Sequence, residues 1–249
     1  MHYLEKIYPS YFELLNPLRK WRILSIKALK EESEYAGSSS AFYKIVSKLE
    51  SNMLIDSFIN SWSNEKFVYL LPTGIKALGE EKSSLAINRD LRFHDAISSK
   101  VARLFRSYHF IEGVYLDQEI AKSYPLLERV PDILAEGQLK SNFRFAIEVE
   151  LTQKSQKRVK EIYRSYSDSK VVNNIIYITD KPSIFKAYQK YLDELGDEIN
   201  QDKFILIFES NLSKKTFNLL NSKAFYRGKD SSLNHIFNLS NNNADVNLE

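Results

Sequence analysis

Three acidic side chains within residues 129–154 have the types and the spacing of a metal site. Asp132 directly follows a proline, and Glu148 and Glu150 are separated by a single residue. Carboxylates that converge on one point repel each other unless a cation lies between them, and hard divalent cations prefer such oxygen ligands. A cation held in this way can polarise a phosphodiester and activate an attacking water. The segment therefore predicts a hydrolytic metal centre.

The hydrophobic pattern of the same segment predicts a hairpin that would bring these acids together. Apolar and other side chains alternate over residues 143–151, which is typical of a strand with one face on the core. The two glutamates then share the opposite face, with Cβ atoms about 6.5–7 Å apart. If residues 130–134 form the neighbouring strand, with a turn around Gly137, Asp132 projects onto that face as well. A solvated strand face that carries two acids is the alternative interpretation.

The residues that follow predict a helix with basic side chains beside the acids. Lys154 is the candidate cation of the centre, and Glu150 is a candidate general base or second metal ligand. On a helix over residues 153–167, Lys157 and Arg158 fall on the polar side, where they suit a phosphate backbone. An ordinary solvated helix face explains the same basic residues equally well.

The proline before Asp132 and the triplet Glu148–Glu150 resemble the motif of the PD-(D/E)xK nuclease superfamily. The sequence departs from the commonest form of that motif, because Glu150 stands where lysine is usual and Lys154 follows four residues later. The resemblance implies that Asp132, Glu148 and Glu150 bind Mg²⁺ or Mn²⁺. Weaker candidates for the same centre are His94, Asp95 and Glu119.

Residues 92–212 are predicted to form a domain in which helices and strands alternate. The order of its central elements is αβββαβ, which is also the order in the nuclease superfamily, so we expect a restriction-endonuclease-like core. The whole chain is then an α/β protein, α+β overall. Helices are predicted over 93–108, 153–167 and 183–199, and strands over 113–120, 130–135, 143–151, 171–179 and 204–208.

Residues 1–82 resemble a winged helix-turn-helix domain, and a polar linker over residues 82–91 follows. In such domains the second helix enters the major groove of DNA and the hairpin touches the backbone, although some serve as protein-interaction modules. The predicted elements are helices over 12–35, broken at Pro17, and over 41–52, a hairpin of 54–59 and 66–71, and a short helix over 73–78. The expected DNA contacts are Ser38, Ser39, Ser40, Tyr43, Lys44, Lys48 and Lys66, with Trp62, Ser63 and Asn64 in the wing.

The two predicted domains in this order look like the replication-relaxation group, and are most similar to the MOBC-type relaxases of mobilisable plasmids and conjugative elements. The segments HDAISSKVARLF, DQEI, RVPDILAEG and FAIEVELTQKS carry the resemblance. It implies a metal-dependent DNA endonuclease that nicks one strand at an origin of transfer, without a lasting tyrosine–DNA bond. It also implies a coupling protein, other relaxosome components and a secretion channel as partners. The alternatives are a DNA-binding regulator of plasmid replication or transcription with an inactive nuclease-like domain, and a protein-interaction module.

Composition restricts the class of protein further. The chain has no cysteine, which excludes disulfides and thiolate metal sites and is typical of a reducing cytoplasm. We expect a cytoplasmic protein without membrane insertion, because no apolar run approaches ~18 residues and the N-terminus does not resemble a secretory signal. The net charge of +3 is too small to indicate nucleic-acid binding by itself. Residues 213–249 are predicted to be an extension whose Ser- and Asn-rich end is disordered.

Overall fold

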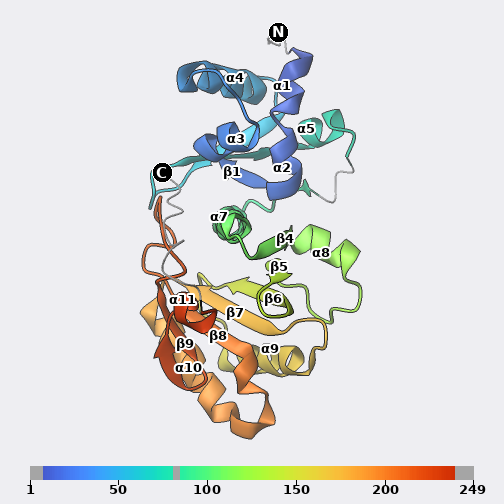
Figure 1. The fold of residues 1–249 in the computed structure, drawn as a ribbon. Coiled ribbons are helices and arrows are strands. Elements are labelled where there is room, and N and C mark those ends of the chain that lie inside the picture. Colours follow the sequence, from blue (N-terminus) through green and yellow to red (C-terminus); the bar gives the residue numbers. More distant parts are fainter. Residues whose placement is uncertain (1–7, 81–84, 239–249) are drawn as a thin grey trace. The chain divides into compact units, whose positions relative to one another are not determined.

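The computed structural model describes residues 8–80 and 85–238, which belong to two compact units, Met1–Lys100 and Val101–Glu249 (Figure 1). The first unit holds a three-stranded antiparallel sheet and the second a seven-stranded mixed sheet, so the expected mixture of helices and sheets is confirmed. The division falls within helix α7 (Arg92–Ser107), beyond the linker expected before it. Part of that linker, residues 81–84, lies outside the described residues.

Helices pack against the sheet of the first unit, whose strand order is β1-β3-β2. Pro17 lies in the first turn of α2, where backbone N–H groups have no partner within the helix. The lack of an N–H on proline therefore costs no helical hydrogen bond. Ser25 and Ser38 cap α3 and α4, because each hydroxyl accepts a hydrogen bond from the backbone N–H three residues later. The elements are α1 (Pro9–Glu13), α2 (Asn16–Trp21), β1 (Ile23–Ser25), α3 (Ile26–Glu32), α4 (Ser39–Ser51), β2 (Ile55–Ile59), β3 (Lys66–Leu70) and α5 (Pro72–Ala77).

The predicted second helix and hairpin of this unit are confirmed. Phe42, Ile45, Val46 and Leu49 form the buried face of α4, as their helical spacing predicted. Strands β2 and β3 pair antiparallel, and β1 pairs with the other edge of β3. Strand β1 was not predicted, because three residues between two helices are too few to show a period.

The seven strands of the second unit are ordered β10-β9-β8-β7-β6-β5-β4 (Figure 1). Strands β6, β7 and β8 are parallel, and each crossover between them contains a helix. The elements after α7 are β4 (Ile111–Leu116), α8 (Asp117–Ser123), β5 (Ile133–Gln138), β6 (Asn142–Val149), α9 (Gln156–Asp168), β7 (Asn174–Thr179), α10 (Pro182–Leu195), the 3-10 helices η1 (Gly196–Glu198) and η2 (Gln201–Lys203), β8 (Phe204–Phe208), β9 (Lys223–Tyr226), β10 (Lys229–Ser231) and α11 (Leu233–Ile236).

Several predicted boundaries in this unit are wrong. The strand expected over 113–120 ends at Leu116, and α8 follows directly. Gly137 lies inside β5 rather than in a turn, where a Cβ atom would meet the carbonyl oxygen of Phe110 at 2.0 Å. The extension predicted over residues 213–249 contributes strands β9 and β10 to the sheet. Strand β10 is an edge strand and carries exposed charged residues. The residues expected to be disordered at the end of the chain, 239–249, lie outside the described residues.

The main core of the second unit lies between the sheet and helices α9 and α10. Leu134 and Ala146 belong to this core from β5 and β6, together with Tyr163 and Tyr166 of α9. On the other face, Phe145 stacks on a ring of the segment after α11 at 5.1 Å between centroids. Both faces of β6 are therefore covered by other parts of the unit. None of the helices in the described residues is long and apolar enough to span a membrane.

Candidate functional site

The three predicted acids lie at one end of the β5–β6 hairpin. Asp132 directly precedes β5, Glu148 is near the end of β6, and Glu150 follows that strand. The Asp132 carboxylate accepts a hydrogen bond from the backbone N–H of Val149 at 2.8 Å, which holds it against the segment that carries both glutamates. Residues two positions apart in a strand share a face, so Asp132 and Glu148 face the same side as the α9 and α10 core. The acids are therefore gathered on one face.

The Glu148 carboxylate is buried and is held by two donors. Its side chain is 2% exposed, and Oε1 accepts hydrogen bonds from Arg129 Nε at 3.0 Å and from the Tyr166 hydroxyl at 2.6 Å. A buried carboxylate needs such partners, because burial removes the water that would otherwise solvate its charge. Burial lowers the pKa of Arg129, but the negative charge and hydrogen bond of Glu148 outweigh this effect and raise it. Arg129 therefore stays charged beside Glu148.

Glu150 has a separate cationic partner. Its side chain is 3% exposed and forms an ion pair with Lys154. Burial raises the pKa of Glu150, the Lys154 charge opposes that rise, and the negative charges of Glu148 and Asp132 add to it. Lys154 itself precedes α9, which begins three residues later than predicted, and Ser155 caps that helix. The structure thus confirms that Lys154 lies beside the acids, although not on the helix.

Tyrosine side chains form the buried wall behind the carboxylates. Tyr177 is opposite Glu148 in the register of β6 and β7, and its hydroxyl makes no hydrogen bond with any other residue that the structure describes. Burial and then the charge of Glu148 raise the pKa of both Tyr166 and Tyr177 well above the usual value. These phenols therefore remain protonated near neutral pH, which makes them poor nucleophiles.

The arrangement does not fit a metal ion as it stands. Within residues 8–80 and 85–238, no group of three or more His, Cys, Asp or Glu side chains is arranged to hold one. The reason is visible at the two glutamates, since Arg129 binds Glu148 and Lys154 binds Glu150. The predicted convergence of three carboxylates on one point is therefore wrong for this conformation, although the acids do lie on one face.

The weaker candidates have structural partners of their own. Asp95 belongs to the first unit, where its carboxylate is 3.5 Å from a guanidinium nitrogen of Arg22 and 3.6 Å from His94 Nδ1. Glu119 lies in the first turn of α8 and accepts a hydrogen bond from the backbone N–H of Leu116 at 3.2 Å. Neither acid shares an ion pair or hydrogen bond with Asp132, Glu148 or Glu150 among the contacts described.

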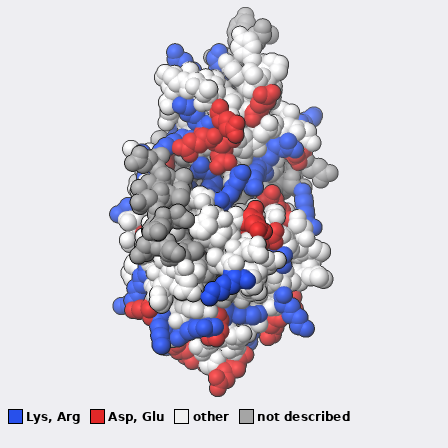
Figure 2. Space-filling model, viewed as in Figure 1, with Lys and Arg blue, Asp and Glu red and all other residues white. Residues whose placement is uncertain are grey.

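Lys157 and Arg158 are exposed on α9, as predicted. Other basic residues of the helix have acidic partners, since Lys160 pairs with Glu194 and Arg164 with Glu198. On the face of the molecule in Figure 2, Lys and Arg side chains lie among Asp and Glu side chains. The two exposed residues of α9 are therefore local phosphate-binding candidates, beside basic residues of the same helix that acids neutralise.

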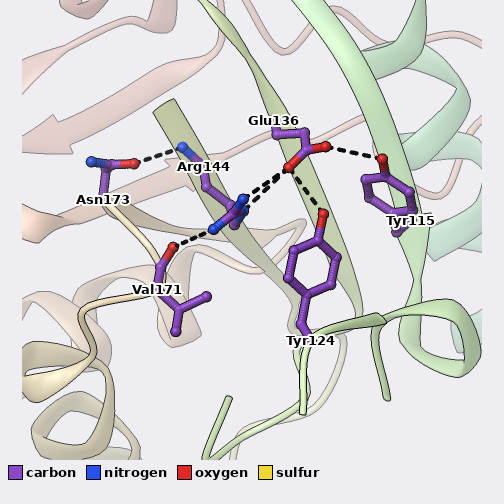
Figure 3. A network of polar contacts seen from close by, with 6 residues as sticks. All are labelled: Tyr115, Tyr124, Glu136, Arg144, Val171 and Asn173. Carbon is purple, nitrogen blue, oxygen red and sulfur yellow. Dashed lines mark hydrogen bonds and ion pairs between the residues drawn. The ribbon is translucent and has the colours of Figure 1, made fainter. Parts of the chain in front are cut away.

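A second polar cluster lies at the other end of the same hairpin (Figure 3). Glu136 of β5 accepts hydrogen bonds from the hydroxyls of Tyr115 and Tyr124 and from the Arg144 guanidinium, which also donates to the Val171 carbonyl. Burial acts to raise the pKa of Glu136, but these hydrogen bonds and the Arg144 charge lower it overall. The cluster ties β4, β5, β6 and the segment after α8 together, and so fixes the hairpin that carries the acids.

Some of the predicted DNA-contacting side chains of the first unit are exposed, and others form hydrogen bonds or ion pairs within the unit. Tyr43 and Lys44 are exposed on α4, and Lys48 is half-buried. The Ser38 hydroxyl is the helix cap, as described above, and the Ser39 hydroxyl accepts a hydrogen bond from Lys30. Ser40 is exposed at the same helix terminus, and Lys66 forms an ion pair with Glu50 at 2.7 Å. The exposed residues of α4 are thus the better candidates for a contact outside the unit.

The β2–β3 loop presents an exposed tryptophan on a well-connected turn. Trp62 is 74% exposed, and its backbone N–H donates to the buried side chain of Asn60 at 2.9 Å. The loop is closed by hydrogen bonds of Asn60 with the backbones of Asn64 and Glu65. Glu65 in turn accepts a hydrogen bond from Lys100 at 3.4 Å. The turn has a defined shape, in which Trp62 points to solvent.

Sequence reasoning gave no role to Arg129, the partner of Glu148. Charge balance could have indicated this role, because two buried glutamates need cations nearby and Arg129 is three residues before Asp132. The hydrogen bond from Tyr166 to Glu148 depends on how α9 packs against β6, which no local pattern specifies.

Comparisons of the chain with protein-family models, with curated proteins and with solved structures gave no match.

Proposed function

We propose that the chain is a DNA endonuclease that depends on a divalent cation and has a restriction-endonuclease-like second unit. The main support is the order α7–β4–α8–β5–β6–α9–β7 with neighbouring strands β4-β5-β6-β7, of which only the last pair is parallel. Apart from the short helix α8 between β4 and β5, this order is consistent with the αβββαβ arrangement expected from the PD-(D/E)xK resemblance and so supports the proposal. In it, Asp132 directly precedes the second of these strands and Glu148 is the last residue but one of the third.

DNA binding by the first unit is the other half of the proposal. Its order of helix, strand, two helices and hairpin, with sheet order β1-β3-β2, supports the winged helix-turn-helix that the sequence resembles. In this interpretation α4 is the helix that enters the major groove, through Tyr43 and Lys44, and the β2–β3 loop is the wing. The expected target is plasmid DNA, in particular an origin of transfer, with relaxosome components and a coupling protein as partners of a cytoplasmic enzyme.

The proposed centre uses Asp132, Glu148 and Glu150 to hold Mg²⁺ or Mn²⁺. When bound, such an ion would polarise a phosphodiester and make water easier to deprotonate. In the structure the glutamates are bound to Arg129 and Lys154, so ion binding requires those contacts to open. A raised pKa makes Glu150 a stronger base than an exposed glutamate, which suits proton removal from water. Lys154 can then stabilise the charge on the phosphate.

A nicking assay tests this proposal. The protein is incubated with supercoiled plasmid that carries the origin of transfer of its own element, with Mg²⁺ or Mn²⁺ or with EDTA. We expect open circles only with the metal, and about a 100-fold or greater loss of nicking in Glu148→Gln. Glu161→Gln, which changes an exposed acid of α9, is the matched control and should nick normally. Binding of each variant to the same DNA is measured in parallel, so that lost cleavage is not confused with lost binding.

One observation favours a second function, that of a DNA-binding regulator with an inactive nuclease-like unit. The Arg129 guanidinium already neutralises Glu148 without an ion. If that contact is permanent, the acids only stabilise the fold. A protein that binds the origin DNA but leaves it supercoiled with every metal would support the regulator and refute the endonuclease.

A further inference from the structure

Trp62 is an exposed aromatic residue on a loop whose backbone is fixed by hydrogen bonds. It is 74% exposed, whereas the other tryptophan of the chain, Trp21, is 1% exposed. The buried Asn60 accepts a hydrogen bond on its side chain from the Trp62 backbone N–H at 2.9 Å. The Asn60 backbone bonds to those of Asn64 and Glu65 at 2.8 and 2.9 Å. The indole therefore projects from a turn of defined shape, so that little order has to be imposed on the loop when it binds.

The tip of this loop does not have the composition of a phosphate clamp. None of residues 60–65 is Lys or Arg, and the one acid among them, Glu65, is bound by Lys100. The strongest phosphate contacts are made by Lys and Arg. Ser61 and Asn64 are exposed near Trp62 and offer hydrogen bonds without a charge. An aromatic face among neutral polar groups suits a flat ring with polar edges better than a phosphate.

The small apolar area at the tip favours a nucleotide base over a protein surface. One aromatic side chain buries about 150–250 Å², whereas a stable protein interface buries about 800 Å² on each partner. Ile59, at the end of β2, is also exposed, at 65%, but the two residues between it and Trp62 are polar. One base stacked on one ring needs no larger apolar surface.

The exposed face of α4 leads to the base of the same hairpin. Tyr43, Ser47 and Glu50 are spaced four and then three residues apart, so they share one face of that helix. Tyr43 and Ser47 are exposed. Glu50 is bound by Ser57 of β2 and by Lys66 of β3. DNA that lies on this face of α4 therefore also meets the β2–β3 hairpin.

We propose that Trp62 stacks on an unpaired base of the DNA that α4 binds. In an intact duplex both faces of a base are covered by its neighbours, so an indole can stack only on a base that is unpaired or turned out of the helix. Every base has an aromatic face, and the first unit then distinguishes opened from closed DNA rather than one sequence from another. This inference rests on the proposed function for its DNA partner and adds the state of that DNA.

DNA affinity is the first measurement, made by fluorescence anisotropy in EDTA so that no DNA is cleaved. The probes are a labelled duplex from the origin of transfer of the element and the same duplex with a central bubble of mismatched bases. We expect the wild type to bind the bubble about 5–150-fold more tightly, as for one base stacked on an aromatic ring. Trp62→Leu should lose this preference, and Trp62→Phe should keep most of it, because phenylalanine retains an aromatic face.

Ile59→Thr is the matched control, since it changes another exposed apolar side chain of the same hairpin and should keep the preference. The variants of Trp62 retain the backbone N–H that bonds to Asn60, so the turn does not depend on the side chain that is changed. Equal affinity of the wild type for the two probes would overturn the proposal. A preference that Trp62→Leu retains in full would overturn it as well.

Tryptophan emission is the second measurement and needs no variant. The Trp21 indole is buried and donates to Glu32 at 2.9 Å, so its emission should not respond to DNA. Stacking on a base quenches indole emission, and we expect the bubbled DNA to quench the part that Trp62 emits and the intact duplex to quench less. Equal quenching by both probes would refute stacking on an unpaired base. No quenching by either probe would refute the DNA contact in favour of a protein partner for Trp62.

The failure of this inference looks different from the failure of the proposed function. Nicking of supercoiled DNA by the wild type without a preference for the bubble refutes the inference alone. A preference for the bubble that Trp62→Leu abolishes, without nicking in any metal, refutes the endonuclease alone and leaves a protein that binds opened DNA.

Discussion

Removal of the Arg129 guanidinium should destabilise the second unit by a predictable amount. Glu148 is 2% exposed, and Arg129 is its cationic partner at 3.0 Å. Breaking a buried ion pair by removing one partner costs about 3–5 kcal/mol, because the remaining charge is left without compensation. Since the Arg129 side chain is 29% exposed, water can reach the vacated position, and we expect the lower end, about 3 kcal/mol, for Arg129→Gln.

Thermal unfolding followed by far-ultraviolet circular dichroism measures this cost. For a unit of this size, about 3 kcal/mol corresponds to a fall of about 6–12 °C in Tm. The double variant with Glu148→Gln is the control and should recover most of the loss, because a neutral amide needs no counter-charge. A change below about 2 °C in the single variant would refute the reasoning.

Two further predictions concern other parts of the molecule. The lowered pKa of Glu136 means that its ionised form stabilises the fold above its unfolded pKa of about 4.3, and that this contribution is lost as pH falls through the lower folded value. The difference in the urea midpoint of unfolding between the wild type and Glu136→Gln should therefore shrink below pH 4. A constant difference down to pH 3 would contradict this prediction. Trp62 is 74% exposed and Trp21 is 1% exposed, so acrylamide should quench about half of the tryptophan emission, namely the half that Trp62 emits. Bound DNA should shield that fraction if the β2–β3 loop is a wing, and equal quenching with and without DNA would argue against it.

The long amphipathic elements were the predictable part of this fold. Helices α4 and α7 and strand β6 have periodic apolar side chains over several turns or pleats, and each of them is present in the structure. The alternation in β6 predicted one buried face, but the face that carries Ala146 and Glu148 is buried as well. Strand β1 and helix α8 are too short to show a period, and contacts with neighbouring elements decide their conformation. Gly137 also misled the prediction, because a glycine serves equally in a turn or where another backbone approaches closely.

The candidate site was predictable in its residue types but not in its contacts. Alternation along β6 indicated that Glu148 and Glu150 share a face, and the hairpin register brought Asp132 to them. The cationic partners of the two glutamates come from the segment before β5 and from the loop after β6, whose courses no periodic pattern specifies. Which cation neutralises a buried acid depends on tertiary packing. In this structure Arg129 and Lys154 neutralise the two glutamates that were expected to bind a metal ion.

The edges of the seven-stranded sheet limit how this protein can meet other chains. At one edge, β10 has only three residues, and Lys229 and Asp230 are exposed and charged. At the other edge, the pairing of β4 is irregular between Ile111 and Gly113, next to the exposed Glu112. Short, charged or bulged borders are poor templates for an incoming strand. Protein partners are therefore expected to dock through side chains and loops rather than by β-augmentation, and the folded unit should resist strand-mediated aggregation at high concentration.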